Sequence, residues 1–128
     1  MRAKRIAQAE SARRWGEKRV TFNAVRKVAL ALEGVEESTW YGTAAFKLNG
    51  AGIARLKEDG KSLVVRVDFE QRRELMEADP ETYYITDHYL NYPAVLVCLS
   101  RVDAAAMRDL LRGACRFVAG EQRKRRAK

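Results

Sequence analysis

Two glycine-containing turns constrain this chain more than any other feature of its sequence. Asn49-Gly50 stands between "AAFKL" and "GIARLK", and Asp59-Gly60 stands before "SLVVRVD". Asparagine, aspartate and glycine accept the positive φ angles that tight hairpin turns require. Segments joined by such turns pair as antiparallel neighbours. Residues 44–68 are therefore predicted to form a meander of strands, with Ala51-Gly52 adding a longer loop or a β-bulge.

Alternation along these strands predicts two faces of different character, because successive side chains of a strand point to opposite sides of the sheet. The apolar face consists of Phe46, Leu48, Ala54, Leu56, Leu63, Val65 and Val67. The cationic face consists of Lys47, Arg55, Lys57 and Arg66. We expect helices to cover the first face and water to cover the second. The cations then either contact phosphates or belong to a solvated face of mixed charge.

Helical spacing and capping residues place three helices around these strands. Thr21 and Asp103 precede segments in which apolar residues recur at helical spacing. The predicted helices span about residues 22–33, 70–78 and 104–119. "STWYG" is predicted to be a short strand, and "AVLVCLS", apolar on both faces, a strand in the middle of the sheet. The fold class is α+β: a two-layer, mostly antiparallel sheet of about five strands with helices packed on one face.

The positive charge of the chain is concentrated at its two ends. The net charge is +8, of which residues 1–20 carry +5 and residues 120–128 carry +4, whereas residues 21–119 carry −1. We therefore expect a basic, partly disordered N-terminal arm (1–20), one domain (21–119) and a basic C-terminal tail (120–128). Basic ends suit a polyanion such as nucleic acid, or serve only as solvated segments that keep a protein soluble.

Several classes of function are disfavoured by what the sequence lacks. Cys98 and Cys115 stand far apart, and His88 is the single histidine, so we expect no metal site. No motif for a cofactor, an activated nucleophile or a glycine-rich phosphate loop is present, so we expect no cofactor and no enzymatic activity. There is no apolar run of the roughly 18 residues that a membrane span needs and no secretory signal, so we expect a cytoplasmic location.

The last predicted helix and the segment after it form the first candidate for phosphate contact. Arg108, Arg112 and Arg116 are four residues apart and therefore share one face of the helix. The tail continues the positive charge with Arg123, Lys124 and Arg125. Together they predict a continuous edge that contacts phosphates, and the alternative is a solvated helix face.

The segment "YYITDHYLNYP", residues 83–93, holds four of the five tyrosines and the histidine. We expect its rings to pack over a sheet edge with their hydroxyls outward, and Asp87-His88 to be a structural hydrogen-bonded pair. Aromatic rings beside basic groups also stack on nucleobases. The candidate pocket in this region consists of Trp40, Tyr41, His88, Tyr89 and Tyr92.

Three stretches carry a resemblance to a known family. "VALALEGVEESTWYGTAAFKLNG", "LKEDGKSLVVRVDFEQRREL" and "ADPETYYITDHYLNYPAVLVCLSRVD" resemble the MmcQ/YjbR family, often labelled DNA-binding, from about Val25 to Val118. The resemblance implies an α+β domain with an antiparallel sheet, similar to frataxin-like and secretion-chaperone-like folds. It also implies a role on double-stranded DNA, which rests on fold similarity to a winged DNA-binding domain.

Individual positions follow the family pattern, with two departures. Trp40 and Gly42 match the Trp–Gly turn of the family, and Phe46 and Lys47 match its Phe-Lys strand. His88 matches the histidine of its late turn. Tyr92 with Pro93 matches the aromatic residue that precedes the next strand. Ala44 stands where a proline is common. Ala51-Gly52 stands at a hairpin tip that often carries a lysine, so this chain lacks a cation there.

These observations support functions of two different classes. The first is a non-enzymatic protein that binds duplex DNA through phosphate contacts with little sequence preference, since no helix carries base-reading side chains at suitable spacing. The alternative is a small-ligand or protein-interaction module built around Trp40, His88 and Tyr92. The expected partner is double-stranded DNA, with no membrane and no metal, and the sequence indicates no particular protein partner.

Overall fold

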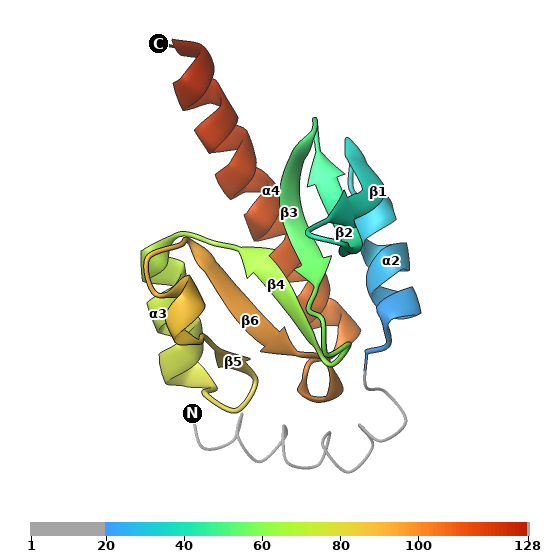
Figure 1. The fold of residues 1–128 in the computed structure, drawn as a ribbon, viewed down its shortest axis with the longest axis vertical. Coiled ribbons are helices and arrows are strands. Elements are labelled where there is room, and N and C mark those ends of the chain that lie inside the picture. Colours follow the sequence, from blue (N-terminus) through green and yellow to red (C-terminus); the bar gives the residue numbers. More distant parts are fainter. Residues whose placement is uncertain (1–19, 128) are drawn as a thin grey trace.

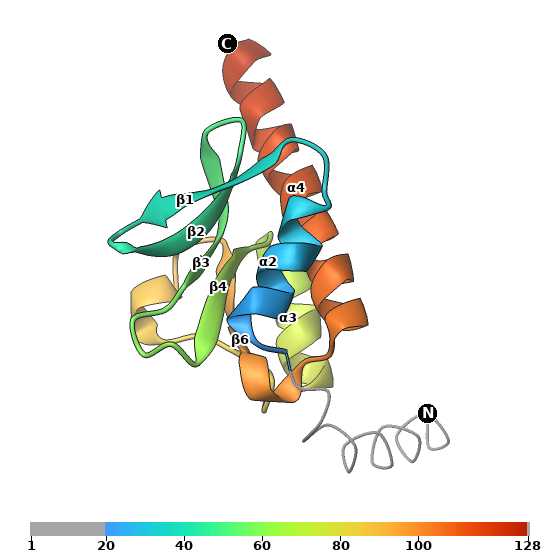
Figure 2. The same ribbon diagram turned by 90° about the vertical axis from the view of Figure 1, so that its right-hand side faces the viewer.

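The computed structural model describes residues 20–127. Within these residues, one antiparallel sheet of six strands, in the order β1-β2-β3-β4-β6-β5, has three helices on one side (Figures 1 and 2). The strands are β1 (Val35–Trp40), β2 (Thr43–Leu48), β3 (Ala51–Leu56), β4 (Ser62–Arg66), β5 (Tyr83–Tyr84) and β6 (Ala94–Cys98). The helices are α2 (Phe22–Leu30), α3 (Phe69–Ala78) and α4 (Ala104–Ala127), with short 3-10 turns η1 (Asp87–Tyr89) and η2 (Leu99–Arg101). The predicted α+β class is confirmed.

Two tight hairpins connect the first three strands. In each hairpin both turn residues have positive φ, Tyr41 and Gly42 between β1 and β2, and Asn49 and Gly50 between β2 and β3. Positive φ at both central residues is typical of a type I′ turn. The turn at Asn49-Gly50 is as predicted, and β3 begins directly after it. The register shifts between Phe46 and Lys47, so the irregularity is a β-bulge inside the ladder and not a longer loop.

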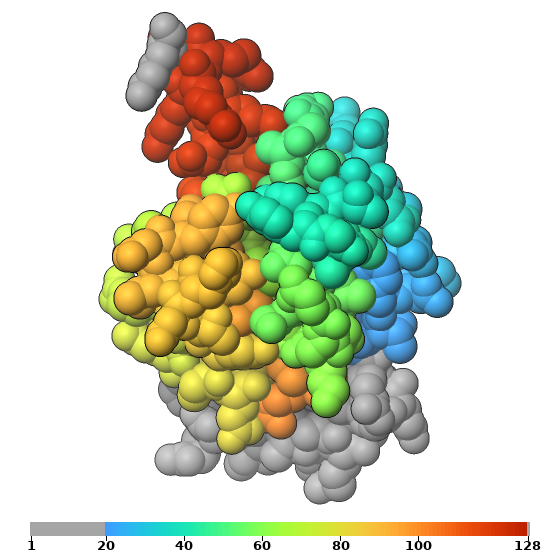
Figure 3. Space-filling view, in the orientation of Figure 1, coloured from blue at the N-terminus to red at the C-terminus, as the bar shows by residue number. Residues whose placement is uncertain are grey.

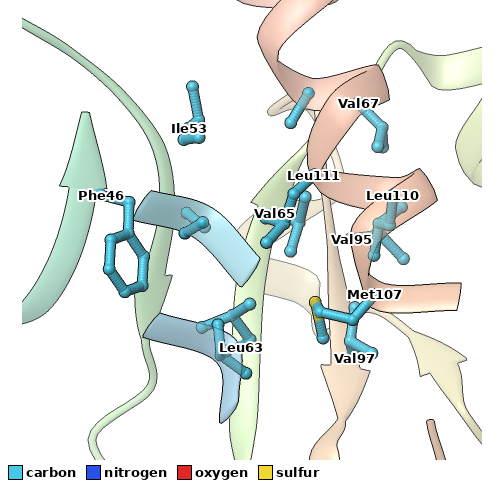
Figure 4. Close-up of a cluster of buried hydrophobic side chains, with 14 of the residues drawn as sticks. Phe46, Ile53, Leu63, Val65, Val67, Val95, Val97, Met107, Leu110 and Leu111 are labelled. Atoms are coloured by element: carbon cyan, nitrogen blue, oxygen red, sulfur yellow. The ribbon is translucent and has the colours of Figure 1, made fainter. Parts of the chain in front are cut away.

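The predicted apolar face is buried under α2 and α4. Phe46, Leu63 and Val65 of the sheet are fully buried, as are Met107 and Leu111 of α4. The close-up shows these side chains meeting between the strands and the helices (Figure 4). Val25 and Ala29 of α2 complete the same cluster. The periodicity of the strands therefore identified the core face correctly.

The opposite face of the sheet is covered, contrary to our expectation. Residues 85–93 cross it between β5 and β6, and a second buried cluster forms from Val64, Tyr89, Ala94 and Leu96. Arg55, which we expected to face water, is only 7% exposed. The expectation was wrong because it treated the face as an open side of a two-layer fold, whereas the chain folds back over it.

Several element boundaries differ from the sequence prediction: β1 begins at Val35 rather than at Ser38, and the two largest differences lie at helix ends. α2 ends at Leu30 rather than near residue 33, and α4 continues to Ala127 rather than ending near residue 119. Gln122 explains part of the extension, because its Nε2 donates to the carbonyl oxygens of Leu48 and Asn49 at 3.0 and 3.4 Å. Most of residues 120–128 therefore continue a helix. The predicted arm, residues 1–20, lies outside the described residues except for Val20, which is buried.

Strand β6 lies inside the sheet, between β4 and the two-residue strand β5. Its residues Ala94–Val97 are all buried, as the apolar character of both faces indicated. The sequence prediction of about five strands omitted β5. Among residues 20–127, no helix is long and apolar enough to cross a membrane.

A buried arginine holds the loop that covers the second face. Arg72 of α3 is 8% exposed, and its guanidinium donates to the carbonyl oxygens of Tyr89 (2.9 Å), Leu90 (2.9 Å), Tyr92 (3.0 Å) and Ala94 (3.2 Å). Its guanidinium carbon also lies 4.8 Å from the ring centre of Phe69. Burial lowers the pKa of Arg72 from its ordinary value. Among the described residues no carboxylate pairs with it, so backbone carbonyls supply its hydrogen-bond acceptors.

We predict that Arg72→Lys destabilises the fold by about 2–4 kcal/mol, because an ammonium group lacks the planar fork of donors and cannot keep all four hydrogen bonds to the loop backbone. Urea unfolding measures the change. Arg73→Lys is the matched control, since the neighbouring Arg73 side chain is 60% exposed. The control changes stability by less than about 0.5 kcal/mol. Equal effects of the two substitutions would contradict the role given to Arg72.

Candidate functional site

A pocket of about 480 Å³ opens on the second face of the sheet, between the β1–β2 hairpin and residues 85–93. Figure 3 turns this face toward the viewer, with the loop at the left and the hairpin above the β3–β4 turn. The lining residues are Trp40, Tyr41, Arg55, Glu58, Val64, His88, Tyr89 and Tyr92. Its volume lies in the range of roughly 300–1,000 Å³ that is usual for small-ligand sites.

Trp40 forms one wall and depends on a glycine. The indole ring lies across Gly52 of β3, where an added Cβ would stand 2.2 Å from the ring atom Cζ3. The φ angle of Gly52 is outside the left-handed region, so the requirement for glycine is steric. The bulge predicted near Ala51-Gly52 is present in this ladder, and Gly52 in addition leaves room for the Trp40 ring.

Tyr41 forms the outer rim in a conformation that tyrosine rarely adopts. Its φ is +55°, and its side chain is 76% exposed and stacks on Trp40 with ring centres 5.7 Å apart. The equivalent turn position between β2 and β3 is held by Asn49, a residue that tolerates positive φ. A bulky side chain at this position costs about 1 kcal/mol or more of backbone strain. The strained backbone conformation of Tyr41 therefore makes this rim a candidate functional site.

Arg55 and Glu58 form the polar edge of the pocket. The Arg55 guanidinium donates to Tyr89 Oη at 3.0 Å and Thr43 Oγ1 at 3.2 Å, and pairs with Glu58 Oε2 at 3.3 Å. It also lies 5.3 Å from the ring centre of Tyr41. The Glu58 side chain is 62% exposed. A hydrogen bond from its own backbone amide, followed by the charge of Arg55, lowers the pKa of Glu58.

The loop supplies the remaining rings. His88 meets Tyr89 edge to face with ring centres 4.8 Å apart, and Tyr89 lies 6.3 Å from Tyr92. Burial raises the pKa of Tyr92 above its ordinary value, so its hydroxyl is neutral over a wide pH range. Contrary to our expectation, not all hydroxyls point outward, since those of Tyr89 and Tyr84 bond to Arg55 and Ser62 of the sheet.

Arg66 links this wall to the helix layer. Its guanidinium lies 5.1 Å from the ring centre of Tyr92 and 5.2 Å from that of Phe117 in α4, and its Nε donates to the Pro93 carbonyl at 3.2 Å. The sequence pattern predicted a phosphate contact for Arg66. Packed between two rings and half-buried, it is poorly placed for that role.

All five residues of the candidate pocket predicted from sequence line the pocket. The sequence analysis assigned Arg55 to phosphate contact instead, and it missed Glu58 and Val64. The spacing of Arg55 and Glu58 at the end of a strand was the available signal, because an arginine three residues before an acid can pair with it. Among residues 20–127, no group of three or more histidine, cysteine, aspartate or glutamate side chains is arranged to hold a metal ion.

The basic residues divide between two sides of the molecule. Lys47 and Lys57 are half-buried on the sheet, Lys47 opposite Glu36 of β1, while Arg55 and Arg66 are engaged by rings. The exposed cations of α4 lie on the helix side and consist of Arg108, Arg112, Arg116, Arg123, Lys124, Arg125 and Arg126. The predicted stripe and tail are therefore joined in one helix, and the sheet cations are not part of it.

The arginine stripe of α4 is long and narrow. Helical residues advance by about 100° and 1.5 Å each, which places Arg108, Arg112, Arg116, Arg123 and Arg126 within a sector of about 80° that extends for about 27 Å. The end of α4 projects past the sheet (Figures 1 and 2). The ion pairs within residues 20–127 involve Arg26, Arg55, Arg73 and Arg101, and none of the α4 cations.

A shallow groove between α2 and α4 adds another cation to this stripe. Lys27, Arg108 and Arg112 surround a space of about 300 Å³ whose apolar floor includes Val28 and Leu32. The sequence analysis did not single out Lys27, because only the packing of α2 against α4 brings it beside the arginines.

Comparisons with known proteins decide the family. The family model described as YjbR matches residues 30–116. The chain belongs to the YjbR family. Among solved structures, this YjbR protein is similar to the Deinococcus radiodurans protein DR2400, whose crystal structure contains a domain described as DUF419. The TM-score is 0.61 at 27% identity, covering 75% of this chain and 76% of that one. No curated protein matches the chain. The resemblance inferred from the sequence is confirmed.

We predict that Gly52→Ala destabilises the YjbR domain by about 1–3 kcal/mol, because the new methyl group displaces the Trp40 ring. Urea unfolding measures the loss. A Trp15→Phe background leaves Trp40 as the only tryptophan, and its emission then reports the displaced ring.

A double-mutant cycle provides the control. Combined with Trp40→Ala, the Gly52→Ala change meets no ring and costs markedly less than it does alone. Strictly additive losses would show that the contact between Trp40 and Gly52 does not limit the residue at position 52.

Proposed function

We propose that this YjbR protein is a non-enzymatic DNA-binding protein that contacts the phosphates of duplex DNA through α4 with little sequence preference. The observation that carries the proposal is the arginine stripe. Its cations are exposed and lack ion-pair partners among residues 20–127, so phosphates can replace their water without first breaking a salt bridge. Each phosphate neutralised releases condensed counterions from the duplex, which drives binding at low salt.

The groove between α2 and α4 supports the same proposal. Lys27, Arg108 and Arg112 line the same groove, so a phosphate bound there would have three cationic side chains around it. Arg123 and the cations that follow it extend the contact along the projecting end of α4. The exposed stripe consists of arginines, without asparagine or glutamine at base-reading spacing, which favours phosphate contact over base readout.

The proposal places the protein in the cytoplasm and gives it no catalytic role. Cys98 and Cys115 are free thiols, as is usual in a reducing compartment. The ring-lined pocket favours a second function, the binding of a small ligand. Pocket and stripe lie on opposite sides of the sheet, so the two functions do not exclude each other.

We predict that replacing Arg108, Arg112 and Arg116 together by glutamine weakens duplex DNA binding by the full chain about 10-fold or more near 100 mM salt. The slope of log K against log salt becomes shallower by about 2 to 3, because each lost phosphate contact removes about 0.9. Fluorescence anisotropy with two duplexes of unrelated sequence measures affinity, salt slope and sequence preference.

The control removes the same charge elsewhere. Lys61, Arg73 and Arg101 are exposed, and their replacement by glutamine lowers the net charge equally. The control triple variant keeps most of the affinity and most of the salt slope. DNA binding that is absent at low salt, independent of salt, or equally weakened by both triple variants would refute the role of α4.

A further inference from the structure

We propose that the pocket beside Trp40 binds a neutral, planar heteroaromatic ring that presents a guanine-like edge, with a carbonyl next to N–H donors. This inference concerns the sheet side of the molecule and does not rest on DNA binding by α4. Four observations carry it: the ring walls, the charge balance of the polar edge, the hydrogen-bonding pattern of that edge and the strained Tyr41 turn.

The walls favour a flat ligand. Trp40, Tyr41, Tyr89 and Tyr92 contribute four aromatic side chains around a space of about 480 Å³, and Val64 adds an apolar floor. Aromatic rings bind planar π systems by stacking, at about 1–3 kcal/mol per base in proteins that bind single strands. The tyrosines of the loop are held in place by the hydrogen bonds that Arg72 donates to the loop backbone. On the hairpin, the Trp40 ring is held against Gly52.

The polar edge favours a neutral ligand over an anion. Arg55 is the arginine that lines the pocket, and Glu58 Oε2 already balances its charge at 3.3 Å. The pKa of Glu58 is lowered, so its carboxylate is ionised and repels a carboxylate or a phosphate placed beside it. A phosphate ligand therefore finds better sites on α4 than here.

The same edge offers donors and acceptors side by side. Arg55 has only N–H donors: its Nη1 already donates to Thr43, Leu56 and Glu58, whereas its Nη2 has one partner among the described residues, Tyr89 Oη, and keeps a second proton for a ligand. Glu58 as an anion only accepts. A ring carbonyl can accept from Arg55 while adjacent N–H groups donate to Glu58, which is the pattern of the Watson–Crick edge of guanine. Enzymes that bind extruded bases read this edge with side-chain hydrogen bonds and stack the ring between aromatic groups.

The turn at Tyr41 shows that stability is sacrificed at the pocket rim. Asn49 occupies the equivalent turn position in the β2–β3 hairpin. Asparagine adopts the left-handed conformation at a lower cost than tyrosine does. Tyr41 is nevertheless 76% exposed and lies against Trp40 and Arg55. A ligand that stacks on this ring would account for its presence, since strained residues cluster at binding sites.

Titration of the full-length Trp15→Phe variant with guanosine, monitored by Trp40 emission, tests the proposal. We expect saturation with a dissociation constant on the order of 10–100 µM. Adenosine and benzoate, a flat anion, bind at least several-fold more weakly. A titration with GMP and with a short guanine-containing single-stranded oligonucleotide then tells whether the base arrives as a free nucleotide or within a strand.

Variants distinguish recognition from folding. Glu58→Gln weakens guanosine binding about tenfold, whereas Glu81→Gln has no effect, although Glu81 also pairs with an arginine, Arg101, at 2.8 Å. Tyr41→Asn lowers affinity while the melting temperature stays at or above the wild-type value, because asparagine relieves the strain. Three results would each overturn the proposal: no saturation with guanosine, benzoate binding as tight as guanosine binding, or unchanged affinity in both Glu58→Gln and Tyr41→Asn.

Discussion

The four hydrogen bonds from Arg72 to the backbone of residues 89–94 are the interaction on which the second face of this domain depends. Without them the Leu90 carbonyl would lose its hydrogen-bond donor, and the carbonyls of Tyr89 and Tyr92, which also accept from the backbone amides of Tyr92 and Ala94, would each lose one hydrogen bond. With them, Tyr89 and Tyr92 are fixed over the sheet and meet the hairpin that carries Trp40. Arg72 of α3, a helix on one side of the sheet, therefore positions the loop that forms the pocket on the other side.

The two sides of the domain present surfaces of different chemical character. The helix side presents unpaired positive charge on a projecting helix, and the sheet side presents rings around an ion pair that is close to neutral. Membership of the YjbR family does not choose between them, because family and fold establish the scaffold and function must be argued from sites. Two binding surfaces on one small scaffold are compatible with either function alone or with both.

Sequence patterns predicted what local rules control and missed what long-range contacts control. Turn pairs and alternation located β2, β3 and β4, and the ring residues of the pocket were identified from their grouping. Nothing local distinguishes buried Arg72 from exposed Arg73, since both stand in the same polar stretch of α3. Likewise, Arg55 was assigned to the correct face, but the loop that buries it was not foreseeable. Part of the extension of α4 is explained by the hydrogen bond from Gln122 to the Leu48 carbonyl, which again is a tertiary contact.

The guanidinium of Arg66 lies 5.1 Å from the ring centre of Tyr92 and 5.2 Å from that of Phe117, so a single side chain contacts both the pocket wall and the helix layer. A ligand that moves the Tyr92 ring would therefore also disturb the guanidinium that lies against Phe117. Coupling between two binding sites is reciprocal. If it acts through this contact, a polyanion bound to α4 would change the affinity of the pocket for its ligand by the same factor as that ligand changes the affinity of α4 for the polyanion. Arg66, which contacts two aromatic rings rather than an acid, would then be the residue through which binding on one side of the sheet affects binding on the other.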